Sequence, residues 1–395
     1  MDNIFIVIPT YWQGTKYRKR LQSDLTFDHP TFLDGEETLT KSLDSIKNIK
    51  TDKKFKVLII TATVDESLNE EVEKRVEDII SPFKQNFDIA QFGFRFLDKI
   101  SKEFKRLNID DNFLTLNGYS SIRNCQLAIP YLLGSQIIGA IDDDEVVENN
   151  YIDQISKFVG KDDIDGIAGR YRYGNGSVFV KERSKNGKED RLFIKKQNYQ
   201  NEVYRFIENS DDDILFSPIV LGGNMVFSKK LIQNVPFDPF VPRGEDIDYL
   251  INSILLGYNW RLDKNLFIDH YPPQCKETNK LQEDVLRFIY EKAKIKKANE
   301  SGKFCFLDVA LLKEYPGNYL KDNLEEEAKY ALDIRPKDIE SESWYSSTTE
   351  VMEKGVLLKE KVNEFFDYAA KWPENLEKLN NDERIKKILD LIYNK

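Results

Sequence analysis

Two apolar runs rich in β-branched residues, with a helical pattern between them, limit the folds open to this chain. The first run covers Ile4–Ile8 and the second covers Phe55–Thr61, and each has the length of a buried strand in a parallel sheet. Between them, residues 37–49 carry apolar side chains at helical spacing. A strand, a helix and a second strand in this order predict a β-α-β unit and a parallel sheet.

Three consecutive aspartates follow the short apolar stretch 136–141, which predicts another buried strand. They are Asp142, Asp143 and Asp144, and Glu145 follows them directly. Open α/β sheets bind ligands at the carboxyl ends of their strands, and Asp-x-Asp spacing can present two carboxylates to a divalent ion. We therefore expect the reaction centre here.

A helix is expected to begin near Ser120 or Ser121, with Arg123 in its first turn. Free backbone N–H groups and a cation at that place would suit a phosphate. Taken alone, Arg123 could also form a surface salt bridge.

Two further polar clusters precede apolar segments. Gly222, Gly223 and Asn224 come before a strand-like run, where paired glycines allow either close approach of a ligand or a tight turn. Glu245 and Asp246 open a predicted helix, and the helix dipole alone favours acidic residues at that position. Each cluster therefore has a structural as well as a functional interpretation.

His270 is one of two histidines in the chain and ends another strand-like run, just before Pro272 and Pro273. This position suggests a metal ligand, although a single histidine is more often structural. Beyond it the apolar spacing becomes helical. We predict a catalytic domain over residues 1–275 and a helical extension over residues 276–395.

Other local patterns predict less central elements. A strand is expected near Phe92–Phe96. Val178–Lys181 and Leu192–Lys195 flank Asn186-Gly187, a sequence typical of a β-hairpin turn.

Composition limits the class of protein. The chain has 58 Lys and Arg against 68 Asp and Glu, a net charge of −10, and this argues against a nucleic-acid partner. The three cysteines are widely spaced and suggest neither a disulfide framework nor a zinc site. The chain shows no leader and no run near the ~20 apolar residues of a membrane span, so we expect no transmembrane segment and a cytoplasmic location.

Taken together, the motifs resemble those of a GT-A fold nucleotide-sugar glycosyltransferase, closest to the family 2 type. The resembling stretches, in the family's order, are Phe5–Tyr11, Ser121–Asn124, Asp142–Asp144, Gly222–Met225, Gly244–Asp248 and Asp269–His270. The resemblance implies an α/β fold: a Rossmann-like GT-A domain with a mainly parallel central sheet, followed by the helical region.

The resemblance also implies a metal-assisted donor site. Asp142 and Asp144 would be the Asp-x-Asp pair and His270 would complete a site for Mn²⁺ or Mg²⁺, with Asp142 on the ribose or the ion's water shell. The ion would hold the donor diphosphate and stabilise the leaving group. The residues implied to contact the nucleotide are Pro9, Thr10, Tyr11, Asp65, Arg123, Asp142 and Asp143.

On the acceptor side, Asp246 would be the general base of an inverting enzyme, with Glu245 as second choice. In a retaining enzyme the two carboxylates would orient sugar hydroxyls. Gly222, Gly223 and Asn224 would border the donor sugar and the acceptor. The stereochemistry stays open, because family 2 is mostly inverting while a metal-site histidine also occurs in retaining enzymes.

The implied reaction is transfer of a sugar, expected to be a hexose, to a hydroxyl of a glycan, a glycoconjugate or a small molecule. UDP-linked donors are the first expectation and GDP-linked donors the second. The C-terminal helices could mediate a homodimer.

Two other classes of protein fit the sequence less well. A sugar nucleotidyltransferase would place a Gly-rich basic loop after the first strand, where this chain reads Pro9–Gln13. A non-catalytic carbohydrate-binding protein of GT-A type is disfavoured by the intact Asp142, Asp144, Asp246 and His270. The segment 14–35 departs from the family, which passes quickly from its first strand to its first helix.

Overall fold

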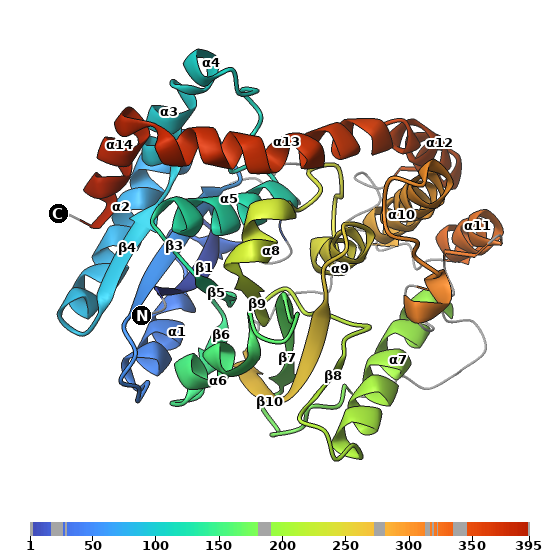
Figure 1. Ribbon diagram of the computed structural model, residues 1–395, viewed down its shortest axis with the longest axis horizontal. Helices are drawn as coiled ribbons and strands as arrows, with labels where there is room; N and C mark the ends of the chain where they lie inside the picture. The colour runs from blue at the N-terminus through green and yellow to red at the C-terminus, as the bar shows by residue number, and fades with distance from the viewer. Residues whose placement is uncertain are drawn as a thin grey trace.

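The protein is described from a computed structural model that covers residues 3–16, 27, 30–180, 191–271, 281–312, 317, 320–321, 323–334 and 346–393, with the backbone alone over 191–198. A central β-sheet runs through the molecule and carries helices on both faces (Figure 1). In sheet order the strands are β4 (Asp88–Phe92), β3 (Phe55–Thr63), β1 (Ile4–Gln13), β5 (Ile137–Ala140), β9 (Met225–Ser228), β7 (Gly166–Arg172), β10 (Trp260–His270) and β6 (Glu145–Val147). β2 (Thr31–Phe32) pairs with β1, and β8 (Ile214–Phe216) pairs with β10.

The first four strands of this order are all parallel to one another, whereas β9 runs antiparallel to both of its neighbours, β5 and β7. β7 and β10 are again parallel, and β6 runs antiparallel to β10 at the edge. The predicted fold class is therefore confirmed: an α/β protein with a mainly parallel central sheet and a helical C-terminal region.

The apolar run in β1 is continuous because both faces of this strand are buried. Ile4, Ile6 and Ile8 belong to one hydrophobic cluster, while Phe5 and Val7 belong to the cluster on the opposite face. Successive side chains of a strand point to opposite faces, so a strand between two helical layers needs apolar residues at every position.

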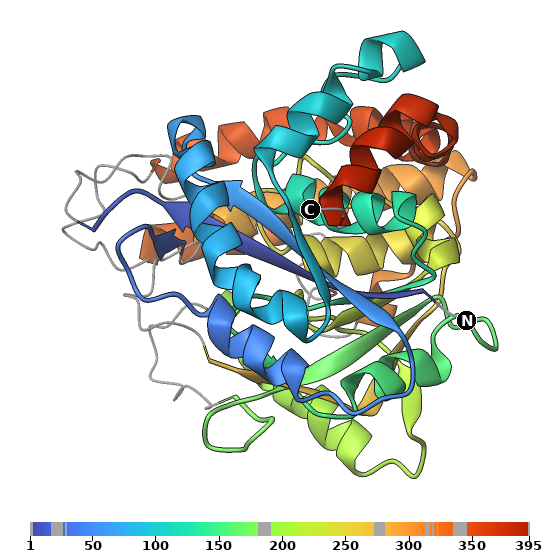
Figure 2. The same cartoon turned by 90° about the vertical axis from the view of Figure 1, so that its left-hand side faces the viewer.

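The helices divide between these two clusters. One face of the sheet is covered by α1 (Leu39–Lys47), α2 (Asn69–Ile80) and α6 (Tyr151–Phe158). The cluster on the other face includes residues of α3 (Phe94–Ser101), α5 (Tyr119–Leu132), α8 (Lys229–Asn234), α9 (Glu245–Leu255), α10 (Leu281–Ser301), α13 (Val362–Asn381) and α14 (Glu383–Tyr393). Figure 2 shows α1 on one side of the sheet and the red helices α13 and α14 on the other.

The remaining elements are smaller or lie at the periphery. The helices are α4 (Phe104–Leu107), α7 (Arg191–Glu208), α11 (Leu324–Ile334) and α12 (Thr348–Lys359), and the 3₁₀ turns are η2 (Glu66–Leu68), η3 (Ser81–Gln85) and η4 (Val309–Leu312). No helix within the described ranges is both long enough and apolar enough to cross a membrane.

The C-terminal helices pack directly on the sheet-bearing part. α13 crosses above α5 and α8, where the buried Trp372 donates from Nε1 to the Ile232 carbonyl at 2.9 Å (Figure 1). The Tyr393 hydroxyl of α14 donates to the Val57 carbonyl of β3 at 2.8 Å. The division at residue 275 stays a prediction, and one hydrophobic cluster includes residues from both sides of it.

Three local predictions differ from the structure. The strand predicted near Phe92–Phe96 is the first. In the structure β4 ends at Phe92 and α3 begins at Phe94, because the apolar residues that follow recur at helical spacing toward the core. Leu192–Lys195 lies in α7 instead of a hairpin strand, and the Asn186-Gly187 turn lies outside the described residues.

The third difference concerns the start of α5. This helix begins at Tyr119 with Gly118 as its N-cap, because Ser120 Oγ donates to the Val241 carbonyl at 3.2 Å instead of capping the helix.

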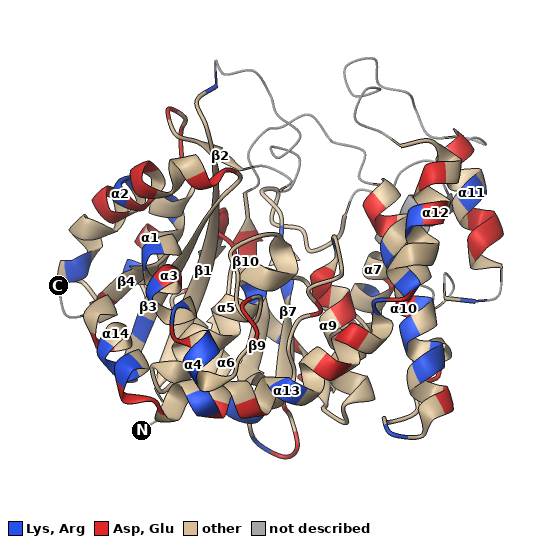
Figure 3. Ribbon diagram, turned by 90° about the horizontal axis from the view of Figure 1, so that it is seen from above, with Lys and Arg blue, Asp and Glu red and all other residues tan. Residues whose placement is uncertain are grey.

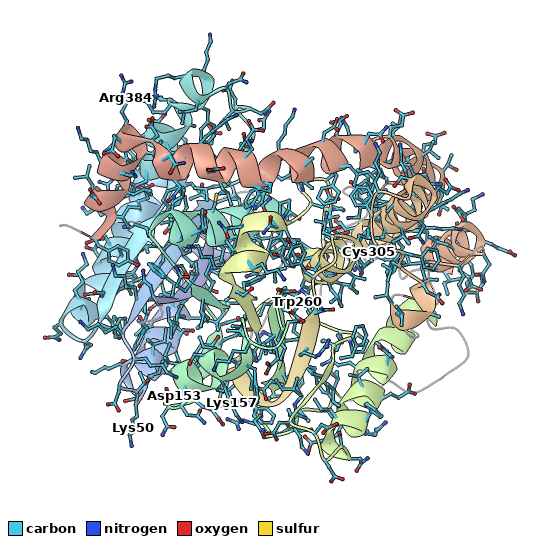
Figure 4. The ribbon with its side chains drawn as sticks, viewed as in Figure 1. Lys50, Asp153, Lys157, Trp260, Cys305 and Arg384 are labelled. Atoms are coloured by element: carbon cyan, nitrogen blue, oxygen red, sulfur yellow. The ribbon has the colours of Figure 1, made fainter. Side chains whose placement is uncertain are left out.

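The helix that carries the predicted acceptor-side carboxylates is fixed to the sheet by aromatic packing. Trp260 of β10 lies near the centre of the molecule (Figure 4). Its ring meets Tyr249 of α9 edge to face at a centroid distance of 6.1 Å and Phe227 of β9 at 5.6 Å. Such contacts fix both the distance and the rotation of α9 above the strands.

Candidate active site

The predicted aspartate turn lies at the tip of β5 and is held by its neighbours. Thr10 of β1 donates from Oγ1 to Asp143 Oδ2 at 2.5 Å. The backbone N–H of Asp142 donates to Glu145 Oε2 at 2.6 Å, and Ser42 of α1 donates to the Asp143 carbonyl at 2.9 Å. These bonds hold Asp143 inside the turn and leave its two aspartate neighbours to make other contacts.

Arg123 connects the aspartate turn to the start of α9. Its side chain is buried, and its guanidinium lies 2.8 Å from Asp142 Oδ1 and 3.3 Å from Glu245 Oε1. It also donates to Gln126 Oε1 at 3.2 Å. The predicted donor-side and acceptor-side carboxylates are thus neighbours of one buried cation, which excludes a surface salt bridge for Arg123.

The two acidic residues that open α9 differ in their surroundings. Glu245 is buried, and burial raises the pKa of its carboxyl although the charge of Arg123 opposes that shift. Asp246 is half-buried, and its carboxylate accepts from the N–H groups of Gly222 at 3.0 Å and Ile247 at 2.8 Å. Of the two, Asp246 is the more accessible to a substrate.

The paired glycines give room to charged side chains of the site. A Cβ atom on Gly222 would lie 2.9 Å from the Arg123 guanidinium, and one on Gly223 would lie 1.9 Å from Glu145 Oε1. Asn224 is fully buried, and its amide donates to the Arg170 carbonyl at 3.1 Å. These contacts explain the three residues structurally, and their contact with a sugar stays a prediction.

A group of potential metal ligands lies beside the aspartate turn. Donor atoms of Asp144, Glu145 and His270 all lie within 4.8 Å of one another, with His270 Nε2 at 3.4 Å from Asp144 Oδ2. The antiparallel pairing of β6 with β10 sets His270 directly opposite Glu145. Two carboxylates and one imidazole form a donor set suited to a divalent metal ion.

This group differs in one member from the predicted ligands. Asp142 forms an ion pair with Arg123, and Glu145 is the third potential metal ligand in its place. Burial, with the nearby Asp142 and Asp144 carboxylates, raises the pKa of Glu145 well above the ordinary glutamate value. The sequence did contain a signal for Glu145, because it directly continues the aspartate run.

The His270 imidazole packs against two tyrosines, Tyr171 of the neighbouring parallel strand β7 and Tyr173 just after that strand. Its ring centroid lies 4.9 Å from that of Tyr171 and 6.4 Å from that of Tyr173. The Tyr171 hydroxyl accepts from the N–H of Gly223 at 2.9 Å. The histidine therefore has a fixed orientation at the end of β10, and sequence reasoning did not identify the two tyrosines that provide it.

The remaining predicted nucleotide-binding residues lie at the ends of β1 and β3. The Tyr11 ring packs against Phe27 at 4.5 Å and against Tyr119 at 5.2 Å. Pro9 lies beyond the last residue of β1 that pairs with β5, where a proline removes no ladder bond to that strand. Asp65 follows β3 and accepts from the Ser67 N–H at 2.9 Å.

Two cavities lie on either side of the loop that leads into α5. One, of about 410 Å³, is lined by Asp65, Phe94 and Asn117 among others. The second, of about 420 Å³, is lined by Asn117, Tyr119 and Arg243 among others. Asn117 borders both cavities, and neither is lined by the aspartate turn, by His270 or by the acidic residues that open α9.

The sequence matches no protein-family model and no curated protein. Among solved structures, S. aureus TarS is 12% identical with a TM-score of 0.44, and the match covers 92% of this chain and 55% of TarS. The mannosyltransferase PcManGT from Pyrobaculum calidifontis, solved with GDP-Man and Mn²⁺, is 12% identical with a TM-score of 0.48, covering 96% of this chain and 86% of that one. GalNAc-T7, solved with UDP, GalNAc and Mn²⁺, is 12% identical with a TM-score of 0.44, covering 94% and 58% of the two chains.

The fold class itself rests on the strand order and the helix positions, and the chemistry of the site rests on the contacts described above.

Proposed function

We propose that the protein is a glycosyltransferase that moves a sugar from a nucleoside-diphosphate sugar to a hydroxyl group of an acceptor. The observation that carries this proposal is the position of Arg123 between Asp142 and Glu245. It unites, at one edge of the sheet, a carboxylate-rich strand tip suited to a metal-bound diphosphate and a carboxylate pair suited to an acceptor.

The donor side is assigned from the ligand group. Asp144, Glu145 and His270 would hold Mn²⁺, with Mg²⁺ as the alternative ion. When bound, the ion would stabilise the charge of the departing nucleoside diphosphate. Asp142, which pairs with Arg123, would then contact the ribose or the ion's water shell.

The acceptor side is assigned from the start of α9. Asp246 is the proposed general base, because it is half-buried and two backbone N–H groups fix its carboxylate. In an inverting reaction it takes the proton of the attacking hydroxyl as the new glycosidic bond forms and the bond to phosphate breaks. Glu245 is the second candidate, and its contact with Arg123 assigns it mainly to holding that cation.

The donor is proposed to be a UDP-linked hexose, with a GDP-linked hexose as second choice. The carboxylate of Asp65 and the ring of Tyr11, at the ends of neighbouring parallel strands, are the proposed contacts for the nucleotide. A cytoplasmic location and a homodimer through the C-terminal helices remain predictions from the sequence.

The first test is calorimetric titration of the protein with UDP, GDP, CDP and dTDP, each with and without Mn²⁺. Metal-dependent binding of one nucleotide is expected and would identify the donor class. Failure of all four nucleotides to bind would refute the transferase assignment.

The second test addresses the base. Asp246→Asn should retain nucleotide affinity. The rate at which free nucleotide appears from the sugar donor should fall by about 10² to 10⁴-fold. Asp153→Asn, an exposed change on α6, is the matched control and should behave as the wild type (Figure 4). Wild-type turnover by Asp246→Asn would exclude Asp246 as the base.

A further inference from the structure

The turn that leads into α9 packs against α10, a helix of the C-terminal region. Figures 1 and 3 show α9 and α10 side by side, and Figure 3 shows charged residues on both. Residues Arg243–Asp246 form the turn that presents the proposed base. Charged side chains of α10 contact this turn and the residues before and after it.

Arg287 makes the most direct of these contacts. Its side chain has no exposed surface, and its guanidinium lies against the backbone of Gly244. Gly244 has φ = 71°, and a Cβ atom there would lie 2.7 Å from the Arg287 guanidinium carbon. A glycine is required for both reasons: the left-handed backbone and the close approach of the cation.

Carboxylates of α10 complete this contact. Arg287 lies 3.2 Å from Asp284 and 3.4 Å from Glu291 on its own helix. Asp284 also lies 3.6 Å from Arg243 of the turn. A chain of alternating charges therefore runs from the turn into the body of α10.

A second buried ionic group holds the segments on either side of the turn. Lys294 of α10 has no exposed side-chain surface and forms ion pairs with Asp238, before the turn, at 2.9 Å, and with Asp248, after it. Tyr290 donates its hydroxyl to Asp238 at 2.8 Å, and Asn252 donates to Asp248 at 2.8 Å. α10 thus contacts the chain before, at and after the proposed catalytic carboxylates.

Burying charged side chains between two helices costs more hydration free energy than burying apolar ones. Ion pairs instead fix one register, because each charge is satisfied only when its partner lies opposite. A displacement of about 1 Å at a reacting group can reduce a rate by about 10²-fold. A fixed register of α10 against this turn would therefore keep the proposed base, Asp246, at the correct distance from its substrate.

We propose that Arg287 is a positioning residue for the transfer reaction. Its guanidinium holds the Gly244 turn so that Glu245 stays on Arg123 and Asp246 faces the acceptor. This inference rests on the proposed function, and it makes α10 a structural part of the active site.

The test compares full-length Arg287→Lys and Arg287→Gln with the wild type. The lysine keeps the charge but not the planar guanidinium that lies on Gly244. Both variants should bind UDP with Mn²⁺ within about twofold of the wild type and lose on the order of 10²-fold in kcat. Arg384→Lys, at a position that is 66% exposed on α14, is the matched control (Figure 4).

A double-variant cycle isolates the contact itself. Gly244→Ala introduces a methyl group against Arg287 without removing a buried charge. Because the shorter glutamine leaves room for that methyl group, Gly244→Ala with Arg287→Gln should lose less kcat than the product of the two single effects.

Hydrogen–deuterium exchange provides a readout that does not depend on activity. Backbone amides of residues 243–248 should exchange faster in Arg287→Lys than in the wild type, while those of β1 and β5 should not. Unchanged exchange at this turn, or a kcat within twofold of the wild type, would overturn the inference. A wild type that turns over no donor would refute the proposed function alone, because exchange still decides whether Arg287 holds the turn.

Discussion

Replacing Lys294 with methionine tests how strongly α10 is tied to the catalytic segment. Methionine keeps most of the apolar side-chain volume but removes the ammonium group that meets Asp238 and Asp248. Both carboxylates are buried, so they would lose their shared cation without gaining water. Removal of one partner from a buried ionic group costs about 3–5 kcal/mol, and we expect a loss of stability in this range.

Urea unfolding followed by tryptophan fluorescence measures this change. Lys296→Met is the control, because Lys296 is 74% exposed on the same helix and lies 3.9 Å from Glu300. An exposed pair of this kind contributes less than about 1 kcal/mol. The comparison therefore separates loss of a buried cation from a general effect of methionine in α10.

The loss should depend on pH. Burial raises the pKa of Asp238 to about 6 although Lys294 opposes the shift, and removing Lys294 removes that opposition. A carboxyl group whose folded-state pKa is raised contributes stability below its unfolded pKa of about 3.9 and loses it as the pH rises through the folded value. Without Lys294 that folded-state pKa is higher still, so the defect of Lys294→Met should grow as the pH rises above about 6 and should stay at its smallest value below pH 6.

A triple variant supplies the decisive comparison. Lys294→Met combined with Asp238→Asn and Asp248→Asn has no uncompensated charge and should be more stable than Lys294→Met alone. A loss of less than about 1 kcal/mol in the single variant, or a triple variant less stable than the single one, would show that Lys294 does not stabilise this buried group as expected.

Three other predictions address the fold and the metal site. Trp372→Ala should cost about 3–5 kcal/mol in the same unfolding assay, because the indole is fully buried, and a loss below about 1 kcal/mol would show that α13 packs loosely. Gly223→Ala should abolish turnover, because the new Cβ would lie 1.9 Å from Glu145 Oε1, whereas Gly174→Ala meets open space and should be neutral. Asp144→Ala should lose Mn²⁺-dependent nucleotide binding in calorimetry, and full binding with Mn²⁺ would contradict the metal assignment.

The fold class could be predicted because its signals are local. A strand covered on both faces is continuously apolar, as Ile4–Ile8 shows, and an amphipathic helix repeats its apolar residues at a fixed spacing. The position of the aspartates at a strand tip followed from the same patterns. By contrast, Leu192–Lys195 reads locally as a strand but forms part of an eighteen-residue helix, α7.

The contacts within the site could not be predicted because they join distant parts of the chain. Glu145 faces His270 through an antiparallel pairing of two strands that are far apart in the sequence. The sequence did not predict that Arg123 pairs with Asp142 and Glu245, and its contact with a phosphate stays a prediction. Spacing along the sequence does not encode which of several nearby carboxylates an arginine will meet.

The packing of α14 against the early strands has a consequence for the timing of folding. The Tyr393 hydroxyl bonds to the Val57 carbonyl across 336 residues of chain, and Ile385, Leu389 and Ile392 of α14 are buried in the same cluster as Phe92 of β4. At 5–20 residues per second, synthesis of the intervening chain takes roughly 15 to 70 s. Throughout that interval the apolar surface beside β3 and β4 has no α14 to cover it, so a newly made chain needs either transient protection or a delay in forming this edge of the sheet.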